Sequence, residues 1–168
     1  MNTTRTATAR LFSLLLLLGL TLTACGFQPR GQAPALPSTL SPLAITGIDT
    51  DTPLYLALQR RLEGSGSTLA TDTGRAAAVL AISNLESRRE LLTVSSDNKA
   101  NEYELIEALS YQVRVGDRET MPHRLSASRT HYAPGEAVLA RTREEATLRQ
   151  TLREELADRL LHRLAAWQ

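Results

Sequence analysis

The stretch EYELIEALSYQVRV, residues 102–115, decides the fold that this sequence predicts. Apolar side chains occupy every second position, with one exception, and polar side chains fill most positions between them; the apolar set is Tyr103, Leu105, Leu109, Tyr111, Val113 and Val115. A period of two is typical of a β-strand with one buried face. Glu107 interrupts the apolar set, so either a bulge shifts the register there or the carboxylate faces a partner.

Further strands are predicted on both sides of this one. Ala76 to Ser83 alternates loosely, and its extended character plausibly continues to Val94 before the polar break at residues 95–99. On the other side, Gly116-Asp117 turns the chain, and Leu125 to Tyr132 gives a further strand. Together these segments predict an antiparallel meander.

Two helical patterns flank the meander. Before it, a short strand at residues 43–48 leads to Thr52-Pro53, an N-cap with proline at the first helical position. A leucine at every fourth position and a glycine-rich stop then predict a helix from Pro53 to Glu63. After the meander, a long amphipathic helix is predicted from Glu136 onward, with Leu148, Leu152, Leu156, Leu160 and Leu164 at steps of four.

The order β-α-β-β-β-α predicts an α+β, two-layer fold with two helices packed on one face of a four-stranded, mainly antiparallel sheet. Residues 43–168 are expected to form a single domain. The sheet face without helices includes Ile106 and Ala108 among polar residues, so it is a candidate docking surface. The pairs Glu145–Arg149 and Glu155–Arg159 lie four residues apart on the last helix and are expected on its solvated face.

The N-terminal segment predicts a lipid anchor. Arg5 and Arg10 precede an apolar run of about twelve residues, which is too short to cross a hydrocarbon core that needs roughly 20. The run ends in Leu22-Thr23-Ala24-Cys25, which looks like a lipobox and contains the only cysteine. We therefore expect residues 1–24 to be a signal peptide and Cys25 to be lipidated; the alternative is an ordinary signal peptide followed by a free cysteine.

Residues 25–42 are expected to be the lipidated N-terminus and a proline-rich linker. Gly26 follows the cysteine where an aspartate would favour retention at the inner membrane. The expected location is therefore the periplasmic side of the outer membrane, with the membrane contacted through the lipid anchor.

Composition argues against several classes of function. The chain carries 19 basic and 18 acidic side chains, which is far from the basic excess of a nucleic-acid binder. The sequence offers no motif of a nucleophilic hydrolase, a phosphate loop or a dinucleotide fold. The three histidines share no metal-ligand spacing. We expect no enzyme activity, no catalytic residue, no metal site and no cofactor.

The basic residues allow two hypotheses. The ordinary one is that they keep the protein soluble, and the more specific one is that some of them bind phosphate groups. Arg88 and Arg89 lie on the long second strand, Lys99 lies in the following turn, and Arg129 and Arg141 flank the start of the last helix. A periplasmic domain tethered at the outer membrane meets lipopolysaccharide, whose lipid A carries phosphates. Arginine binds phosphate through two parallel hydrogen bonds.

The sequence resembles the LPS-assembly lipoprotein family, LptE. The resemblance begins at Cys25-Gly26-Phe27-Gln28-Pro29-Arg30-Gly31, where cysteine, glycine and an aromatic residue are followed by an arginine. It continues through Glu102-Tyr103, Arg129-Thr130, Ala140-Arg141 and Glu144-Glu145 into the leucine-rich helix. It departs from the family at Pro29 and in the serines Ser95 and Ser96 of the turn.

The resemblance implies a non-enzymatic subunit of the lipopolysaccharide translocon. Such a subunit would plug the β-barrel LptD in a one-to-one complex, help that barrel assemble and bind lipopolysaccharide. Lys99 and Arg141 are the implied lipopolysaccharide-binding residues. The alternative is an accessory lipoprotein of another envelope system, lipid transport or cell-wall synthesis, with a periplasmic or inner-membrane partner.

Overall fold

The structure is a computed structural model and describes residues 34–94, 100–132 and 138–167. Cys25, the predicted signal peptide and the predicted hairpin turn at residues 95–99, with Lys99, lie outside the described residues. No helix in the described ranges is long and apolar enough to span a membrane.

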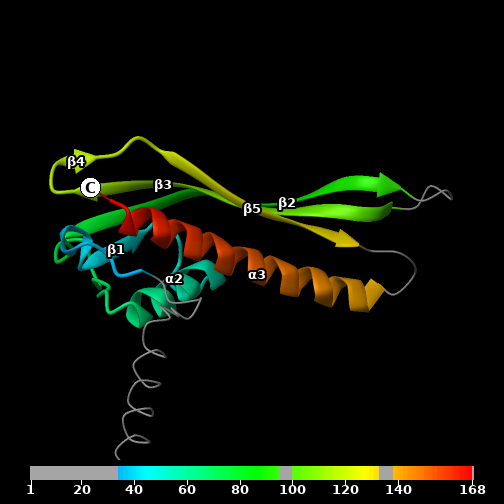
Figure 1. Ribbon diagram of the computed structural model, residues 1–168, viewed down its shortest axis with the longest axis horizontal. Helices are drawn as coiled ribbons and strands as arrows, with labels where there is room; N and C mark the ends of the chain where they lie inside the picture. Colours follow the sequence, from blue (N-terminus) through cyan, green and yellow to red (C-terminus); the bar gives the residue numbers. More distant parts are fainter. Residues whose placement is uncertain (1–33, 95–99, 133–137, 168) are drawn as a thin grey trace, which may run out of the picture. The chain divides into compact units, whose positions relative to one another are not determined.

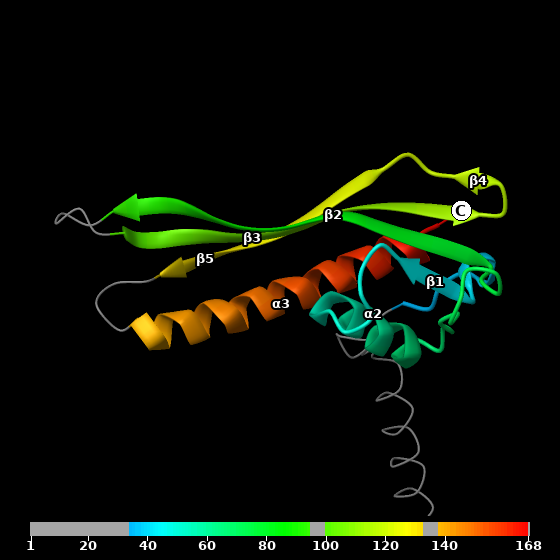
Figure 2. The same ribbon diagram turned by 180° about the vertical axis from the view of Figure 1, so that it is seen from behind.

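The described chain forms a two-layer α+β fold, as predicted. Both helices lie on the same side of one sheet (Figures 1 and 2). The elements in chain order are η1 (Ser38–Leu40), β1 (Leu43–Thr46), α2 (Pro53–Gly64), β2 (Ala78–Val94), β3 (Ala100–Val115), β4 (Arg118–Glu119), β5 (His123–Tyr132) and α3 (Val138–Ala165). The sequence prediction missed the 3₁₀ turn η1 and the two-residue strand β4, because neither is long enough to show a period.

The sheet is mainly antiparallel. β2 and β5 both pair with β3 in antiparallel fashion, and β1 pairs with β2 in parallel across Leu43–Thr46. The parallel pair is possible because α2 lies in the crossover between β1 and β2. β4 pairs with the last two residues of β3, beyond the part of β3 that β5 covers. The described sheet therefore has five strands, one more than predicted.

The irregularity nearest Glu107 lies in β2 and not in β3. The β3–β5 register runs without a break from Glu102 to Tyr111, so no bulge occurs at Glu107 on that side. Instead, the β2–β3 register shifts between Ser83 and Glu86. Asn84 lies in this bulge with a φ of 48°, a left-handed conformation that asparagine tolerates better than most residues.

The helices bury their leucines between themselves and the sheet. The hydroxyl of Thr52 accepts a hydrogen bond from the backbone N–H of Tyr55, and Pro53 begins α2, as the sequence predicted. The α3 side chains at less than 2% exposure are Leu152, Leu156, Ala157, Leu160, Leu161 and Leu164. Each fully buried leucine contributes roughly 1.5–3 kcal/mol relative to an exposed one, so this cluster is the main source of stability.

The packed domain begins earlier than the predicted boundary at Leu43. Leu36 and Leu40, which fall in the predicted linker, are both part of the hydrophobic core. The backbone N–H of Leu36 also donates to the hydroxyl of the buried Ser67. The prolines around them predicted an extended linker, but the two leucines bury apolar surface and hold this segment against the hydrophobic core.

Gly47, directly after β1, requires glycine for two reasons. Its φ is +86°, and a β-carbon at this position would overlap the carbonyl oxygen of Ile82 in β2. Because glycine has no side chain, the backbone that follows β1 can lie directly against the backbone of β2.

We expect Gly47→Ala to lower the free energy of unfolding by at least about 2 kcal/mol, because it adds both backbone strain and overlap with a backbone atom. Urea unfolding followed by circular dichroism measures the change. Gly64→Ala is the matched control: a β-carbon there meets nothing within 4 Å, so stability should be unchanged or slightly higher. Equal stability of the two variants would contradict this account.

Candidate functional site

Of the residues predicted to bind lipopolysaccharide, the structure describes only Arg141. Arg141 lies in the first turns of α3 and is half-buried. It forms no ion pair with any other residue in the described ranges. Cys25 and Lys99 fall outside those ranges, so their predicted roles stay predictions.

The other arginines singled out from the sequence all have acidic partners. Arg88 lies 3.3 Å from Glu86 and 3.1 Å from Glu90, on the sheet face without helices. On the helix-covered side, Arg89 pairs with Glu145 at 3.2 Å, and Arg129 pairs with Glu155 at 3.3 Å. The guanidinium of Arg89 also lies 4.7 Å above the centre of the Tyr103 ring. Their charges are therefore largely compensated within the domain.

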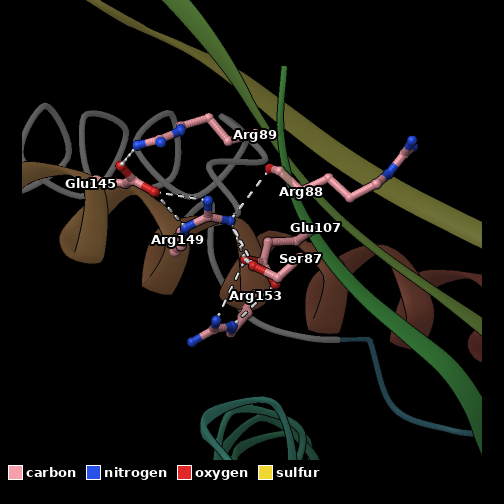
Figure 3. A network of polar contacts seen from close by, with 7 residues as sticks. All are labelled: Ser87, Arg88, Arg89, Glu107, Glu145, Arg149 and Arg153. Atoms are coloured by element: carbon pink, nitrogen blue, oxygen red, sulfur yellow. Dashed lines mark hydrogen bonds and ion pairs between the residues drawn. The ribbon is translucent and has the colours of Figure 1, made fainter. Parts of the chain in front are cut away.

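Glu107 is the carboxylate that interrupts the apolar alternation of β3, and it is 2% exposed. Its carboxylate accepts hydrogen bonds from Arg149 at 3.1 Å, from Arg153 at 3.2 Å and from the hydroxyl of Ser87 at 2.6 Å (Figure 3). Both arginines lie on α3, 42 and 46 residues away in sequence. The sequence allowed either a bulge at Glu107 or a carboxylate that faces a partner. The second interpretation is therefore correct.

These contacts form a polar seam between the sheet and α3, consisting of Ser87, Arg89, Glu107, Glu145, Arg149 and Arg153 (Figure 3). Arg149 is the central member, because it also donates to Glu145 at 2.8 Å and to Ser87 at 2.6 Å. The sequence interpretation of Glu145–Arg149 as a solvated helix face was thus wrong. The pair forms, but its arginine points to the sheet and is 17% exposed.

Two members of the seam, Glu145 and Arg149, have pKa values shifted toward their charged forms. Burial by itself raises the pKa of Glu145, but the hydrogen bond and charge of Arg149, followed by those of Arg89, outweigh burial and hold that pKa below its ordinary value. Burial lowers the pKa of Arg149, but Glu145 and Glu107 outweigh it, and the pKa is raised. The contact between Glu145 and Arg149 is therefore ionic at neutral pH.

The face of the sheet without helices is more closed than the sequence predicted. Ala108 is fully buried and Ile106 is half-buried. Glu86 and Arg124, on the strands either side of β3, form a two-pronged ion pair at 2.8 and 2.9 Å on this face. The hydrogen bond from Arg124, followed by its charge, holds the pKa of Glu86 below its ordinary value.

Exposed apolar side chains collect at the end of the domain where α3 begins. This distal end comprises the end of β2, the start of β3, the end of β5 and the start of α3 (Figure 1). The exposed residues are Leu91, Leu92, Val94, Tyr132 and Leu139. Arg141 lies two residues beyond Leu139, so the distal end combines apolar surface with a cation that has no acidic partner among the described residues.

His131 is also buried at this end, opposite Tyr103 on β3. Its Nε2 lies 3.9 Å from a carboxylate oxygen of Glu144, beyond hydrogen-bond distance. Neither ring nitrogen has a hydrogen-bond partner in the part of the chain that the structure describes. In the same ranges, no three His, Cys, Asp or Glu side chains are grouped as a metal would require.

Comparison with known proteins places the chain in a family. The family model LptE, described as lipopolysaccharide-assembly, matches residues 40–164. The LPS-assembly lipoprotein LptE of Pectobacterium atrosepticum is 30% identical over 157 residues, covering 92% of this chain and 85% of the relative. The LPS-assembly lipoprotein LptE of Photorhabdus laumondii is also 30% identical, over 156 residues, with the same coverage.

Solved structures share the fold. The rare lipoprotein B of Shewanella oneidensis superposes with a TM-score of 0.67 at 23% identity, covering 74% of this chain and 93% of that one. A lipoprotein B of Nitrosomonas europaea gives a TM-score of 0.66 at 18% identity, covering 84% of this chain and 91% of that one. The fold thus defines a class of small, two-layer α+β domains. Within that class, the chain belongs to the LptE family of lipopolysaccharide-assembly lipoproteins, which confirms the resemblance seen in the sequence.

Sequence reasoning did not find the polar seam. The one available signal was Glu107, an acidic residue in an otherwise apolar row, which showed that a partner was needed and not which one. Arg149 and Arg153 lie four residues apart and therefore on one helix face, but both were equally compatible with solvent.

We expect Glu107→Gln to lower the free energy of unfolding by about 3 kcal/mol, because it leaves two arginines at the interface without their shared counter-charge. Chemical denaturation measures the change. Glu104→Gln is the matched control, since Glu104 lies on the same strand but faces the opposite side, and it should cost less than about 0.5 kcal/mol. Similar costs for both variants would mean that the seam contributes nothing specific.

Proposed function

We propose that this chain is a non-enzymatic outer-membrane lipoprotein of the lipopolysaccharide translocon. In this role it plugs and helps assemble an LptD-like β-barrel in a one-to-one complex, and it binds lipopolysaccharide. Cys25 carries the lipid anchor on the periplasmic side. The observation that carries the proposal is the family match across residues 40–164, nearly the whole of the described domain.

The distal end supports lipopolysaccharide as a ligand. Lipopolysaccharide combines phosphates with acyl chains, so its complement is a surface that combines cations with apolar side chains. Arg141 offers a guanidinium without an acidic partner among the described residues. Leu139 and Tyr132, which are 79% and 57% exposed, offer apolar area at the same end of the domain. Lys99 would add a second cation from the hairpin between β2 and β3.

The seam supports the same proposal in a different way. A binding surface must hold its groups in place before the ligand arrives, because ordering them afterwards costs binding energy. The contacts Arg89–Glu145 and Arg149–Glu107 fix the first half of α3 against the sheet, and this half of the helix carries Arg141. The position of Arg141 is thus set by the fold.

The partner is tested by isolating the lipidated protein from native membranes after crosslinking. We expect a tight one-to-one complex with a large outer-membrane β-barrel. Recovery of the chain only as a free monomer would overturn the proposal. Recovery with a periplasmic or inner-membrane enzyme would favour an accessory role in another envelope system.

The ligand is tested by charge reversal. We expect Arg141→Glu combined with Lys99→Glu to weaken lipopolysaccharide binding at least tenfold while the circular dichroism spectrum stays native, because both cations face the phosphates. The control carries Arg75→Glu and Arg118→Glu, which change the net charge equally at exposed positions elsewhere. Unchanged binding in the first variant, or an equal loss in both, would remove Arg141 and Lys99 from the site.

A further inference from the structure

Two adjoining hollows lie at the other end of α3, between its last turns and the start of β5. The larger one has a volume of about 540 Å³, and its lining includes Arg124, Arg159, His162 and Arg163. The smaller one has a volume of about 410 Å³, and Tyr111, His123, Arg163 and Trp167 contribute to its lining. Both volumes are within the range of small-molecule sites, and Arg163 lies between the two hollows.

The lining of both hollows is basic. No aspartate or glutamate contributes to either of them, although the chain as a whole is nearly neutral. The terminal nitrogens of Arg124 bind Glu86, and those of Arg159 bind Glu155 and the backbone oxygen of Ser126. Arg163 has no ion-pair partner among the residues that the structure describes, so its planar group of five N–H donors is available.

The smaller hollow adds flat apolar surfaces to this charge. The rings of Tyr111 and His123 lie 5.5 Å apart, and the half-buried Trp167 packs against the hydrophobic core. Because Tyr111 is only 5% exposed, its ring is held rigidly. Rigid aromatic faces pack against the C–H faces of sugar rings at little cost in conformational entropy.

This region is separate from the proposed lipopolysaccharide-binding residues. Arg163 lies 22 residues after Arg141 on the same helix, which is about 33 Å at 1.5 Å per residue. One phosphorylated head group is too small to contact both ends. A ligand held at Arg163 is therefore an additional one, or a distant part of a long one.

We propose that the two hollows form a binding site for a phosphorylated sugar. The phosphate lies against the guanidinium of Arg163, and the sugar ring packs on Trp167 and His123. A basic residue near a helix C-terminus also complements the helix dipole. If Arg163 only complemented the helix dipole, the protein would bind no ligand there. Binding measurements therefore distinguish this structural role from the proposed binding site.

Trp167 is the only tryptophan of the chain, so its fluorescence reports directly on this site. The mature protein in detergent is titrated with glucose 1-phosphate, with glucose, with inorganic phosphate and with lipopolysaccharide. We expect a saturable change with glucose 1-phosphate, a weaker one with inorganic phosphate and none with glucose. A response to lipopolysaccharide alone would also support the site and would show that the sugar phosphate is lipid-borne.

Arg163→Gln should weaken the response at least tenfold, and Arg163→Lys, which keeps the charge but loses the two-pronged geometry, should weaken it less. Arg118→Gln, an exposed arginine on β4, is the control and should leave it unchanged. Circular dichroism verifies that each variant is folded. No response to either glucose 1-phosphate or lipopolysaccharide, responses of equal, measurable size to glucose 1-phosphate and inorganic phosphate, or an unchanged response in Arg163→Gln would overturn the proposal.

Discussion

The buried carboxylate of Glu107 is the constraint on which the arrangement of the two layers depends. A carboxyl group at 2% exposure is tolerated only when its oxygens find hydrogen-bond or ion-pair partners. Arg149 and Arg153 meet that need together, and they do so only when α3 lies in one register along β3. Two arginines that share one buried carboxylate add a geometric requirement to the apolar packing of the leucine row.

The two halves of α3 contact the rest of the domain in different ways. The second half buries leucines against the sheet and α2 and supplies most of the stabilising apolar contact. The first half is held to the sheet by ion pairs, Arg89–Glu145 and Arg149–Glu107, and carries Arg141 at the end of the domain where exposed apolar side chains also lie. The chain thus leaves apolar surface open at the end where the lipid-binding proposal places the ligand, without losing the position of the helix.

The chain belongs to the LptE family, whose members are lipopolysaccharide-assembly lipoproteins, and the features above can be considered in that context. A domain that handles an amphipathic, phosphorylated lipid benefits from cations whose charge the protein itself does not neutralise. Most arginines of the described chain are paired internally, as Arg88, Arg89 and Arg129 are. Arg141 and Arg163, near opposite ends of α3, are among the arginines without an acidic partner in the described residues, and the two binding proposals rest on them.

The sequence by itself determined the strand at 102–115, the helix that begins at Pro53 and the leucine-rich last helix, because their periods and caps are local properties of the chain. It also determined the family, since the relevant residues recur in order along the chain. Only the tertiary structure decided the bulge at Asn84 and the burial of Leu36 and Leu40. It alone showed that Arg149 faces the sheet, because the partner Glu107 lies 42 residues away and no local pattern distinguishes a buried ion pair from a solvated one.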